Sequence, residues 1–324
     1  MRKLASRLPT VKFQEYVQLD GSKKVLVQQV GDGSIIKRFD KTSIPRKSTD
    51  VVCPHFLEFK WAYGCPFDCA WCFLKGTLRL LKTGTRPIIK DYCKIQKHLD
   101  SFFSNDGQSR ELLNTGELAD SLMAENSKRP FSKFIIPLFE EYEHHKVLFL
   151  TKSTYIRNLM DIKNHNSAVI SFSLNAPSVA RRWEKAPLVK ERIKAAKILN
   201  ELNYEVRVRI DPIVPIRDWQ KEYFKLVDMI FENFVPERIT LGSLRGLQST
   251  INNVKDKSWT VFLTEKSNWG KKIAFSTRYQ LYNTIINYLK TKYNYVKVAL
   301  CKETVGMWDS LNMDFKKIRC NCLL

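Results

Sequence analysis

CPFDCAWC (residues 65–72) contains three closely spaced cysteines, Cys65, Cys69 and Cys72, directly after a strand-like run, FLEFKWAYG (56–64). Three thiolates this close can ligate three irons of a [4Fe–4S] cluster, because cysteine thiolates are the ligands of such clusters. The fourth iron then has no protein ligand and is open to a chelating small molecule. The alternatives are a zinc site completed by a distant Cys or His, or three unrelated buried thiols. The CxxxCxxC spacing is not a usual zinc-finger spacing, so it favours the iron–sulfur cluster.

Strand-like and helix-like runs alternate on the C-terminal side of this loop. Strands are predicted at 56–64, 111–117, 147–153, 168–175, 204–212 and 238–244, with helices near 91–105, 130–144, 154–163, 187–203 and 218–233. Six strands alternating with helices predict a parallel α/β architecture, either open or barrel-like. Parallel sheets place ligand sites at the carboxyl ends of their strands, which is where the cysteine loop begins.

The segments outside this alternation differ in pattern. Residues 1–50 are expected to form an N-terminal extension, with a β-hairpin in KKVLVQQVGDGSIIKRF (23–39) that turns at Gly31-Asp32-Gly33. Residues 51–245 are the predicted barrel. Residues 246–324 are expected to form a C-terminal extension with an amphipathic helix at 277–293, a short strand at 296–301 and a tail that ends in CNCLL.

The composition restricts the classes of protein to which the chain can belong. The 324 residues contain 54 Lys and Arg against 33 Asp and Glu, a net charge of +21, which suggests a polyanionic partner such as nucleic acid or an anionic membrane surface. No stretch approaches the ~18 apolar residues of a spanning helix, which excludes an integral membrane protein. Eight cysteines are too sparse for a stapled secreted scaffold, so the expected location is the cytosol.

Several further motifs carry a resemblance to a known family. With the cysteine loop, FLTK (149–152), ISFSLN (170–175), ERIKAAKIL (191–199), RIDPIVP (209–215) and NWGKK (268–272) resemble the spore photoproduct lyase family of DNA repair enzymes, over residues 52–320. That family lies in the radical S-adenosylmethionine (SAM) superfamily. The resemblance implies a partial (β/α)6 barrel and a [4Fe–4S] cluster whose open iron chelates SAM. Reductive cleavage of SAM, with a donor such as flavodoxin or ferredoxin, would then generate a 5′-deoxyadenosyl radical that abstracts hydrogen.

The resemblance also implies which residues contact the amino acid part of SAM. Thr115-Gly116-Glu117 resembles the motif that receives the SAM amino group, and Lys152 resembles the lysine that approaches the SAM carboxylate. Arg192, in the predicted helix 187–203, is a second candidate for the carboxylate. The alternatives are a tight turn with a solvated Glu, a surface lysine and a solvated helix arginine.

Polar residues on two neighbouring strands are predicted to face the nucleoside. Ser171, Ser173 and Asn175 alternate through ISFSLN, so all three project to one face of their strand. A ribose would satisfy them, or they bond to one another or to water. Arg209 and Asp211 end the next strand on a shared face and resemble residues near the nucleoside, although a buried salt bridge explains them equally well.

Two departures from the family pattern bear on the fate of the substrate radical. Members carry a hydrogen-donating cysteine at the end of the second strand and tyrosines in and beside the cluster loop. Glu117 occupies that cysteine position here, and Trp71 and Phe73 occupy the tyrosine positions. Direct reversal of thymine damage by the cysteine–tyrosine path is therefore in doubt, with Cys93 and Cys301 as the replacement thiols to consider beside Glu117.

Two basic runs lie close to the predicted site. The first contains Lys75, Arg79, Lys82, Arg86 and Lys90, and the second Arg181, Arg182, Lys185, Lys190 and Arg192. Phosphate contacts from such runs give salt-dependent binding, and Trp183 could stack on an exposed base. Either run alone is also explained as a solvated face.

The remaining cysteines gather near the end of the sequence. Cys301, Cys320 and Cys322, perhaps with Cys53, are a candidate second metal site, either an auxiliary iron–sulfur cluster or a zinc. Buried or idle thiols are the alternative, because the ligand set is incomplete in sequence.

The leading hypothesis is a radical SAM enzyme that repairs or modifies DNA or RNA. The alternatives are a radical SAM enzyme with a substrate other than nucleic acid, and a zinc-containing nucleic-acid-binding protein without catalysis.

Overall fold

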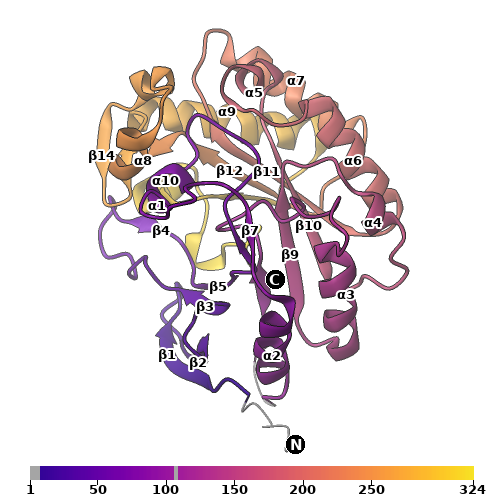
Figure 1. Ribbon diagram of the computed structural model, residues 1–324. Helices are drawn as coiled ribbons and strands as arrows, with labels where there is room; N and C mark the ends of the chain where they lie inside the picture. Colours follow the sequence, from indigo (N-terminus) through magenta and orange to yellow (C-terminus); the bar gives the residue numbers. More distant parts are fainter. Residues whose placement is uncertain (1–7, 106–108) are drawn as a thin grey trace, which may run out of the picture.

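A ten-stranded sheet forms the centre of the protein in the computed structural model, which describes residues 8–105 and 109–324 (Figure 1). Its strand order is β1-β2-β3-β5-β8-β9-β10-β11-β12-β16. Seven of these strands run parallel to one another: β5 (Phe56–Phe59), β8 (Leu112–Asn114), β9 (Lys146–Thr151), β10 (Ala168–Leu174), β11 (Glu205–Ile213), β12 (Ile239–Ser243) and β16 (Val298–Leu300). The chain fills these positions in sequence order, which confirms the predicted parallel α/β class.

Helices connect the parallel strands as the alternation predicted. They are α2 (Tyr92–Phe103), α3 (Phe131–Tyr142), α4 (Arg157–Met160), α5 (Pro177–Trp183), α6 (Val189–Glu201) and α7 (Trp219–Phe231). Every residue of β10 is buried, as expected for a central strand of a parallel sheet that is covered on both faces. The short α5 was not predicted, because it occupies only seven residues ahead of α6.

Both predicted extensions are hydrogen-bonded to this sheet. β2 (Lys23–Val30) and β3 (Ile36–Phe39) are antiparallel and turn at Gly31 and Gly33, which both have positive φ, so the predicted hairpin is confirmed. β1 (Val11–Val17) pairs with β2, and β3 pairs with β5. At the other edge, β16 follows α9 (Phe275–Tyr293) and adds a seventh parallel strand beyond the six that the sequence indicated.

Smaller elements surround the carboxyl ends of the parallel strands. They are β4 (Val51–Val52) with β17 (Glu303–Thr304), β6 (Ala62–Tyr63) with β7 (Ile88–Ile89), the sheet of β13 (Arg245–Gly246), β14 (Glu265–Ser267) and β15 (Gly270–Lys272), and the helices α1 (Leu74–Thr77), α8 (Gln248–Asn253) and α10 (Val305–Ser310). Two 3₁₀ turns cover Ser258–Phe262 and Phe315–Lys317. None of the helices in the described part of the chain is long and apolar enough to cross a membrane.

Candidate cofactor and active site

A cavity of about 510 Å³ opens at the carboxyl ends of the parallel strands. Its lining brings together residues from loops that are far apart in sequence. The lining includes Cys65, Cys69, Cys72, Gly116, Glu117, Asp120, Lys152, Ser173, Arg209, Asp211, Arg245, Cys301 and Lys302. The cavity therefore contains the three loop cysteines and most of the residues predicted to contact SAM.

The cysteine loop is held in place by backbone hydrogen bonds at both ends. Gly64, with φ +84°, lets the chain turn directly before Cys65, whose N–H donates to Thr85 O at 2.9 Å. A Cβ at Gly64 would lie 2.3 Å from Arg86 O, so only glycine fits this close approach. Further along the loop, Ala70 N donates to Trp183 O at 2.8 Å. In Figure 1 the segment that follows, with α1 and β7, crosses the front of the sheet.

The three loop thiols fit an iron–sulfur cluster better than a single metal ion. Burial raises the pKa of the Cys69 thiol to about 12 and raises those of Cys65 and Cys72, so metal binding there displaces protons. Within residues 8–105 and 109–324, no three His, Cys, Asp or Glu side chains are grouped as ligands of one metal ion. A cubane does not require such convergence, because each thiolate binds a different iron. The donor set of three thiols on one cavity wall fits that cluster.

Glu117 occupies the end of β8 and points into the cavity. Asn114 fixes this turn, since its Oδ1 accepts from Gly116 N at 2.9 Å and its Nδ2 donates to Glu117 Oε1 at 3.2 Å. Burial raises the pKa of Glu117 to about 7, with a smaller contribution from Cys322. The alternative interpretation was a tight turn with a solvated Glu. The turn is present, but the Glu117 carboxyl group faces the cavity rather than bulk solvent.

Lys152 and Arg192 are joined by one buried carboxylate, Glu184. Lys152 Nζ lies 3.8 Å from Glu184 Oε1, and Arg192 Nη1 donates to Glu184 Oε2 at 2.7 Å. Burial is the largest influence and would lower the pKa of Lys152, but Glu184 together with Cys69 and Cys72 outweighs it, and the pKa is raised. Arg192 is fully buried, donates also to Ser173 O and Pro187 O, and does not line the cavity. The guanidinium of Arg192 therefore belongs to the ion pair that positions Lys152, and its contact with the SAM carboxylate stays a prediction.

The sequence left open a buried salt bridge between Asp211 and Arg209. In the structure Asp211 forms a salt bridge with Arg245 instead. Arg245 Nη1 and Nη2 donate to the two Asp211 oxygens at 3.0 and 2.9 Å. Burial would raise the pKa of Asp211, yet Arg245 outweighs it and lowers the pKa. A Cβ at Gly242 would lie 2.6 Å from Asp211 Cγ, so the glycine makes room for this pair at the cavity wall.

Only one of the three polar residues on β10 reaches the cavity. Ser173 lines it, whereas Ser171 Oγ accepts from Asn321 Nδ2 at 2.7 Å. Asn175 Nδ2 donates to Pro212 O at 2.8 Å, and its Oδ1 accepts from Tyr223 OH at 2.9 Å. Protein groups satisfy the side chains of Ser171 and Asn175, and the binding of a cofactor by these two residues stays a prediction.

Cys93 and Cys301, the two thiols considered as hydrogen donors, lie in different places in the structure. Cys93 is exposed on α2 and lies outside the cavity lining, so the structure gives no support to its predicted catalytic role. Cys301 follows β16, lines the cavity, and accepts from Arg245 Nη2 at 3.6 Å. The part of the lining that the structure describes contains no tyrosine.

The second metal site is not formed. Cys322 Sγ accepts from Arg209 Nη2 at 3.0 Å and Cys320 is hydrogen-bonded to Cys322, whereas the cavity thiol Cys301 contacts Arg245. Among the described residues, no group containing these cysteines is arranged to hold an ion. The structure therefore does not support a second metal site, and it places Cys320 and Cys322 in buried positions and Cys53 and Cys301 in half-buried ones.

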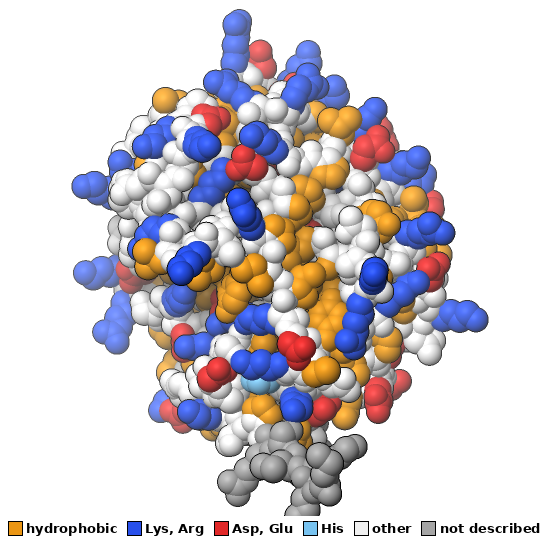
Figure 2. All heavy atoms as spheres, viewed as in Figure 1, with side chains coloured by type: hydrophobic (Ala, Val, Ile, Leu, Met, Phe, Trp, Pro, Cys, Tyr) orange, Lys and Arg blue, Asp and Glu red, His pale blue; other side chains and the backbone are white. Residues whose placement is uncertain are grey.

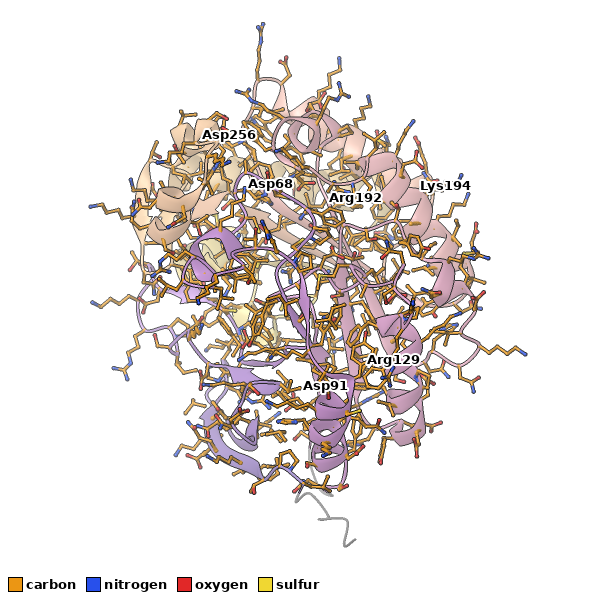
Figure 3. All side chains as sticks on the ribbon, in the orientation of Figure 1. Asp68, Asp91, Arg129, Arg192, Lys194 and Asp256 are labelled. Atoms are coloured by element: carbon orange, nitrogen blue, oxygen red, sulfur yellow. The ribbon has the colours of Figure 1, made fainter. Side chains whose placement is uncertain are left out.

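The segment from Phe73 to Lys90 forms a basic and apolar surface beside the cavity. Arg79, Lys82 and Arg86 are exposed, and exposed apolar side chains, Phe73, Leu80, Leu81, Ile88 and Ile89, alternate with them. Figure 2 shows this face with apolar side chains in the middle and Lys and Arg side chains distributed around them. Asp68, labelled in Figure 3, binds Lys75 at 2.6 Å and Lys185 at 2.9 Å.

Trp183 does not offer a stacking surface. Its ring is 2% exposed, its Nε1 donates to Ser258 Oγ at 2.8 Å, and the Arg182 guanidinium covers it at 4.5 Å from the ring centroid. The prediction that Trp183 stacks on a base is wrong, because the packing around α5 encloses the ring. Arg192, from the same basic run, is also buried, whereas Arg181 and Arg182 are exposed.

Four charged residues of the site were missed: Asp120, Glu184, Arg245 and Lys302. Asp120 accepts from Thr151 Oγ1 at 2.7 Å and from Lys152 N at 2.8 Å, which ties the ends of β8 and β9 together. Lys302 Nζ lies 3.9 Å from the centroid of the Trp269 ring, which also lines the cavity. A charged residue shortly after a predicted strand is the signal that would have found Asp120, Arg245 and Lys302.

Comparisons with known proteins agree with this site. The family model described as spore photoproduct lyase matches residues 54–243. Two curated spore photoproduct lyases, from Clostridium acetobutylicum and Bacillus subtilis, are 26% and 24% identical over 172 and 174 residues, which cover 51% and 52% of this chain and 48% and 49% of theirs. The chain therefore spans about half the length of the curated relatives it matches.

Solved structures show the same fold. A spore photoproduct lyase complexed with dinucleoside spore photoproduct superimposes with a TM-score of 0.64 at 15% identity, covering 80% of this chain and 78% of that chain. A variant of the lyase with bound AdoMet and dinucleoside spore photoproduct gives a TM-score of 0.63 at 14% identity, with the same coverage of both chains. The family model covers more than half of the chain and includes the cysteine loop. The chain belongs to the spore photoproduct lyase family, within the radical SAM superfamily.

Proposed function

We propose that this protein is a radical SAM enzyme that repairs or modifies nucleic acid. The observation that carries the proposal is the cavity in which three thiols of one loop meet side chains of both charges from the neighbouring strands. When bound, a [4Fe–4S] cluster on Cys65, Cys69 and Cys72 and SAM supply radical chemistry that begins with hydrogen abstraction. An external electron donor, such as flavodoxin or ferredoxin, is part of the proposal.

The residues of the chain bind and orient SAM in this proposal. Glu117 receives the amino group and Lys152, positioned by Glu184, receives the carboxylate, which matches opposite charges on the amino acid part. Ser173, Arg209 and Asp211 line the part of the cavity assigned to the nucleoside. Cys301 is the remaining predicted thiol that reaches the cavity, and it is proposed to return hydrogen to the substrate.

Nucleic acid is the proposed substrate class because the mouth of the cavity adjoins the basic and apolar surface of residues 73–90. The net charge of +21 supports the same partner. A base inside a duplex must leave the stack to reach a cavity of this kind. The lyase structures with a bound dinucleoside lesion support this class through their shared fold.

The test is to reconstitute the cluster anaerobically and to measure 5′-deoxyadenosine with UV-irradiated DNA, undamaged DNA and RNA. Production that rises with one nucleic acid is the expected result and identifies the substrate class. The variant with Cys65, Cys69 and Cys72 changed to Ala should bind no cluster and produce none, whereas Cys93→Ala is the matched control outside the cavity. Production indifferent to every nucleic acid would indicate another substrate, and no production from a properly clustered protein would refute the enzyme class.

A further inference from the structure

Residues 320–322, near the end of the sequence, are buried, whereas Leu324 is exposed. Asn321 is fully buried, and its Nδ2 donates to Ser171 Oγ at 2.7 Å and to Val208 O at 2.9 Å. Arg207 Nη1 donates to Asn321 O and to Leu323 O at 2.9 and 2.6 Å. In Figure 1 the C-terminus accordingly lies near the middle of the molecule. These bonds fix the position of Cys322, which is 8% exposed.

Two side-chain N–H groups of the described residues donate to the Cys322 sulfur. Arg209 Nη2 lies at 3.0 Å and Asn114 Nδ2 at 3.6 Å, and the Cys320 thiol is also hydrogen-bonded to Cys322. The amide of Asn114 cannot turn around, because its Oδ1 already accepts from Gly116 N at 2.9 Å. A neutral thiol in this position would have only the Cys320 sulfur, a weak acceptor, for its own proton. The surroundings therefore select the thiolate, which only accepts hydrogen bonds.

Arg209 needs an anion that the carboxylates do not supply. The buried Arg192 and Arg278 and the half-buried Arg245 each form an ion pair with Glu or Asp. Arg209, which is half-buried in the cavity wall, has no carboxylate oxygen within 4.0 Å among the described residues, and its one hydrogen bond in that part of the chain goes to Cys322. A guanidinium that is partly withdrawn from water is stabilised by a counter-ion in direct contact. The thiolate is the group in contact with Arg209 that can balance its charge.

We propose that Cys322 is a buried thiolate that acts as the counter-ion of Arg209 and holds Arg209 and Glu117 in position for SAM. The link to Glu117 is Asn114, whose Nδ2 contacts both Glu117 Oε1 and the Cys322 sulfur. Cys322 does not line the cavity, so it is a positioning residue rather than a catalytic one. This inference rests on the proposed function, since it assumes that SAM binds at these two residues.

The charged groups around Cys322 agree with its ionisation. Hydrogen bonding from Cys320, then the positive charges of Arg209 and Lys302, lower the pKa of Cys322 to about 5 against the effect of burial. Two nearby acidic groups, Glu117 after β8 and Cys53 before β5, would oppose the ionisation of Cys322 if they were themselves charged. The pKa of each is raised. Both therefore carry less negative charge than Cys322 at neutral pH.

The experiment compares full-length protein reconstituted to equal iron content in four forms: wild type, Cys322→Ser, Cys322→Asp and the surface control Cys93→Ser. Ultraviolet difference spectra at neutral pH measure the thiolate, and equilibrium dialysis with SAM measures its dissociation constant. We expect Cys322→Ser to lose one thiolate and to bind SAM about tenfold more weakly, as expected for a lost charge-assisted hydrogen bond. Cys322→Asp should regain most of that affinity, and Cys93→Ser should match the wild type in SAM affinity.

A second variant, Arg209→Leu, keeps the cysteine and tests the pair if the tail variants do not fold. Its thiolate absorbance should appear only at higher pH than in the wild type. Equal thiolate absorbance in wild type and Cys322→Ser, or unchanged SAM affinity in Cys322→Ser, would overturn the inference. Wild-type protein that binds no SAM would refute the proposed function and the positioning role together, while the spectra would still decide whether the thiolate–arginine pair exists.

Discussion

Two carboxyl groups that line the same cavity have opposite pKa shifts because their neighbours differ. Asp211 is held by two hydrogen bonds from Arg245, which outweigh burial and lower its pKa. Burial is the main cause that raises the pKa of Glu117, and the negative charge of Cys322 raises it further, to about 7. At neutral pH Asp211 is therefore fully ionised while Glu117 is poised between its two forms.

This poise predicts a pH dependence of SAM binding. An amino group binds the ionised form of Glu117, and the fraction of that form falls as the pH falls through about 7 rather than through the ordinary value of 4.5. The SAM dissociation constant should therefore rise by about tenfold per pH unit below the pKa. Glu117→Gln should bind weakly at every pH and lose this dependence. Equal affinity from about pH 6 to about pH 8 in the wild type would contradict the role of Glu117.

Arg192 is expected to govern stability through its ion pair. Replacing it by Met leaves Glu184 buried with only the more distant Lys152, so Arg192→Met should reduce the free energy of unfolding by about 3 kcal/mol. Chemical denaturation of the reconstituted protein measures this loss. Lys190→Met is the matched control on the same helix, because Lys190 is exposed and should cost less than about 0.5 kcal/mol. Similar losses in both variants would show that the Arg192 pair does not stabilise the fold.

Residue types and spacing identified part of the site. The end-of-strand positions of Glu117, Lys152, Arg209 and Asp211 were sufficient to place them at the cavity, because strand ends in a parallel sheet meet at one edge. The same reasoning failed for Ser171. It shares a face with Ser173, but the sequence pattern does not show that Asn321, 150 positions away, occupies the space next to it.

Among the elements, the cysteine loop depends on the turn that precedes it. Gly64→Ala places a Cβ 2.3 Å from Arg86 O in a backbone with φ +84°. We expect this substitution to cost about 3 kcal/mol and to lower the iron bound per chain, because the loop must move away from residues 85–86. Iron analysis after reconstitution, together with thermal unfolding, measures both effects.

Gly84→Ala is the matched control for this prediction. Gly84 also has positive φ, +55°, but a Cβ there would have no heavy atom within 4 Å. It should cost only about 1 kcal/mol, the backbone effect alone, and leave the bound iron unchanged. Equal iron content in both variants would show that the close contact at Gly64 does not shape the loop.

The elements themselves were predicted well where the pattern is local. The alternation of apolar runs placed six parallel strands and five connecting helices, because hydrophobic periodicity is set by which face an element buries. The seventh parallel strand, β16, was recognised as a strand but assigned to an extension. Its partner β12 lies 59 positions earlier at Ile239↔Val298, and no local pattern indicates which strands pair across such a distance.

For the whole molecule, the basic surface predicts salt-dependent binding of nucleic acid. Changing Arg79, Lys82 and Arg86 to Glu should weaken DNA binding at least about tenfold at low salt and reduce the slope of log K against log salt by about 3, one for each lost phosphate contact. Fluorescence anisotropy with a labelled oligonucleotide measures both. The matched control changes Lys194, Lys221 and Lys290, exposed on α6, α7 and α9, to Glu.

The control separates a local surface from overall charge. Both triple variants lower the net charge equally. If nucleic acid binds at residues 73–90, the variant of Arg79, Lys82 and Arg86 should lose more DNA affinity than the control. Equal losses would mean that nucleic acid responds only to the total charge of the protein.

The amino-acid sequence alone determined the fold class and the cluster loop. Both follow from short-range order: apolar periodicity within each element, and three thiols within eight residues. Tertiary structure alone decided which residues surround the cavity floor. Arg209 contacts Cys322 across 113 positions, and Asp211 contacts Arg245 across 34. Such pairs form because a parallel sheet gathers its strand ends and because the tail folds back beneath them. Packing in three dimensions, rather than spacing along the chain, determines which charge balances which.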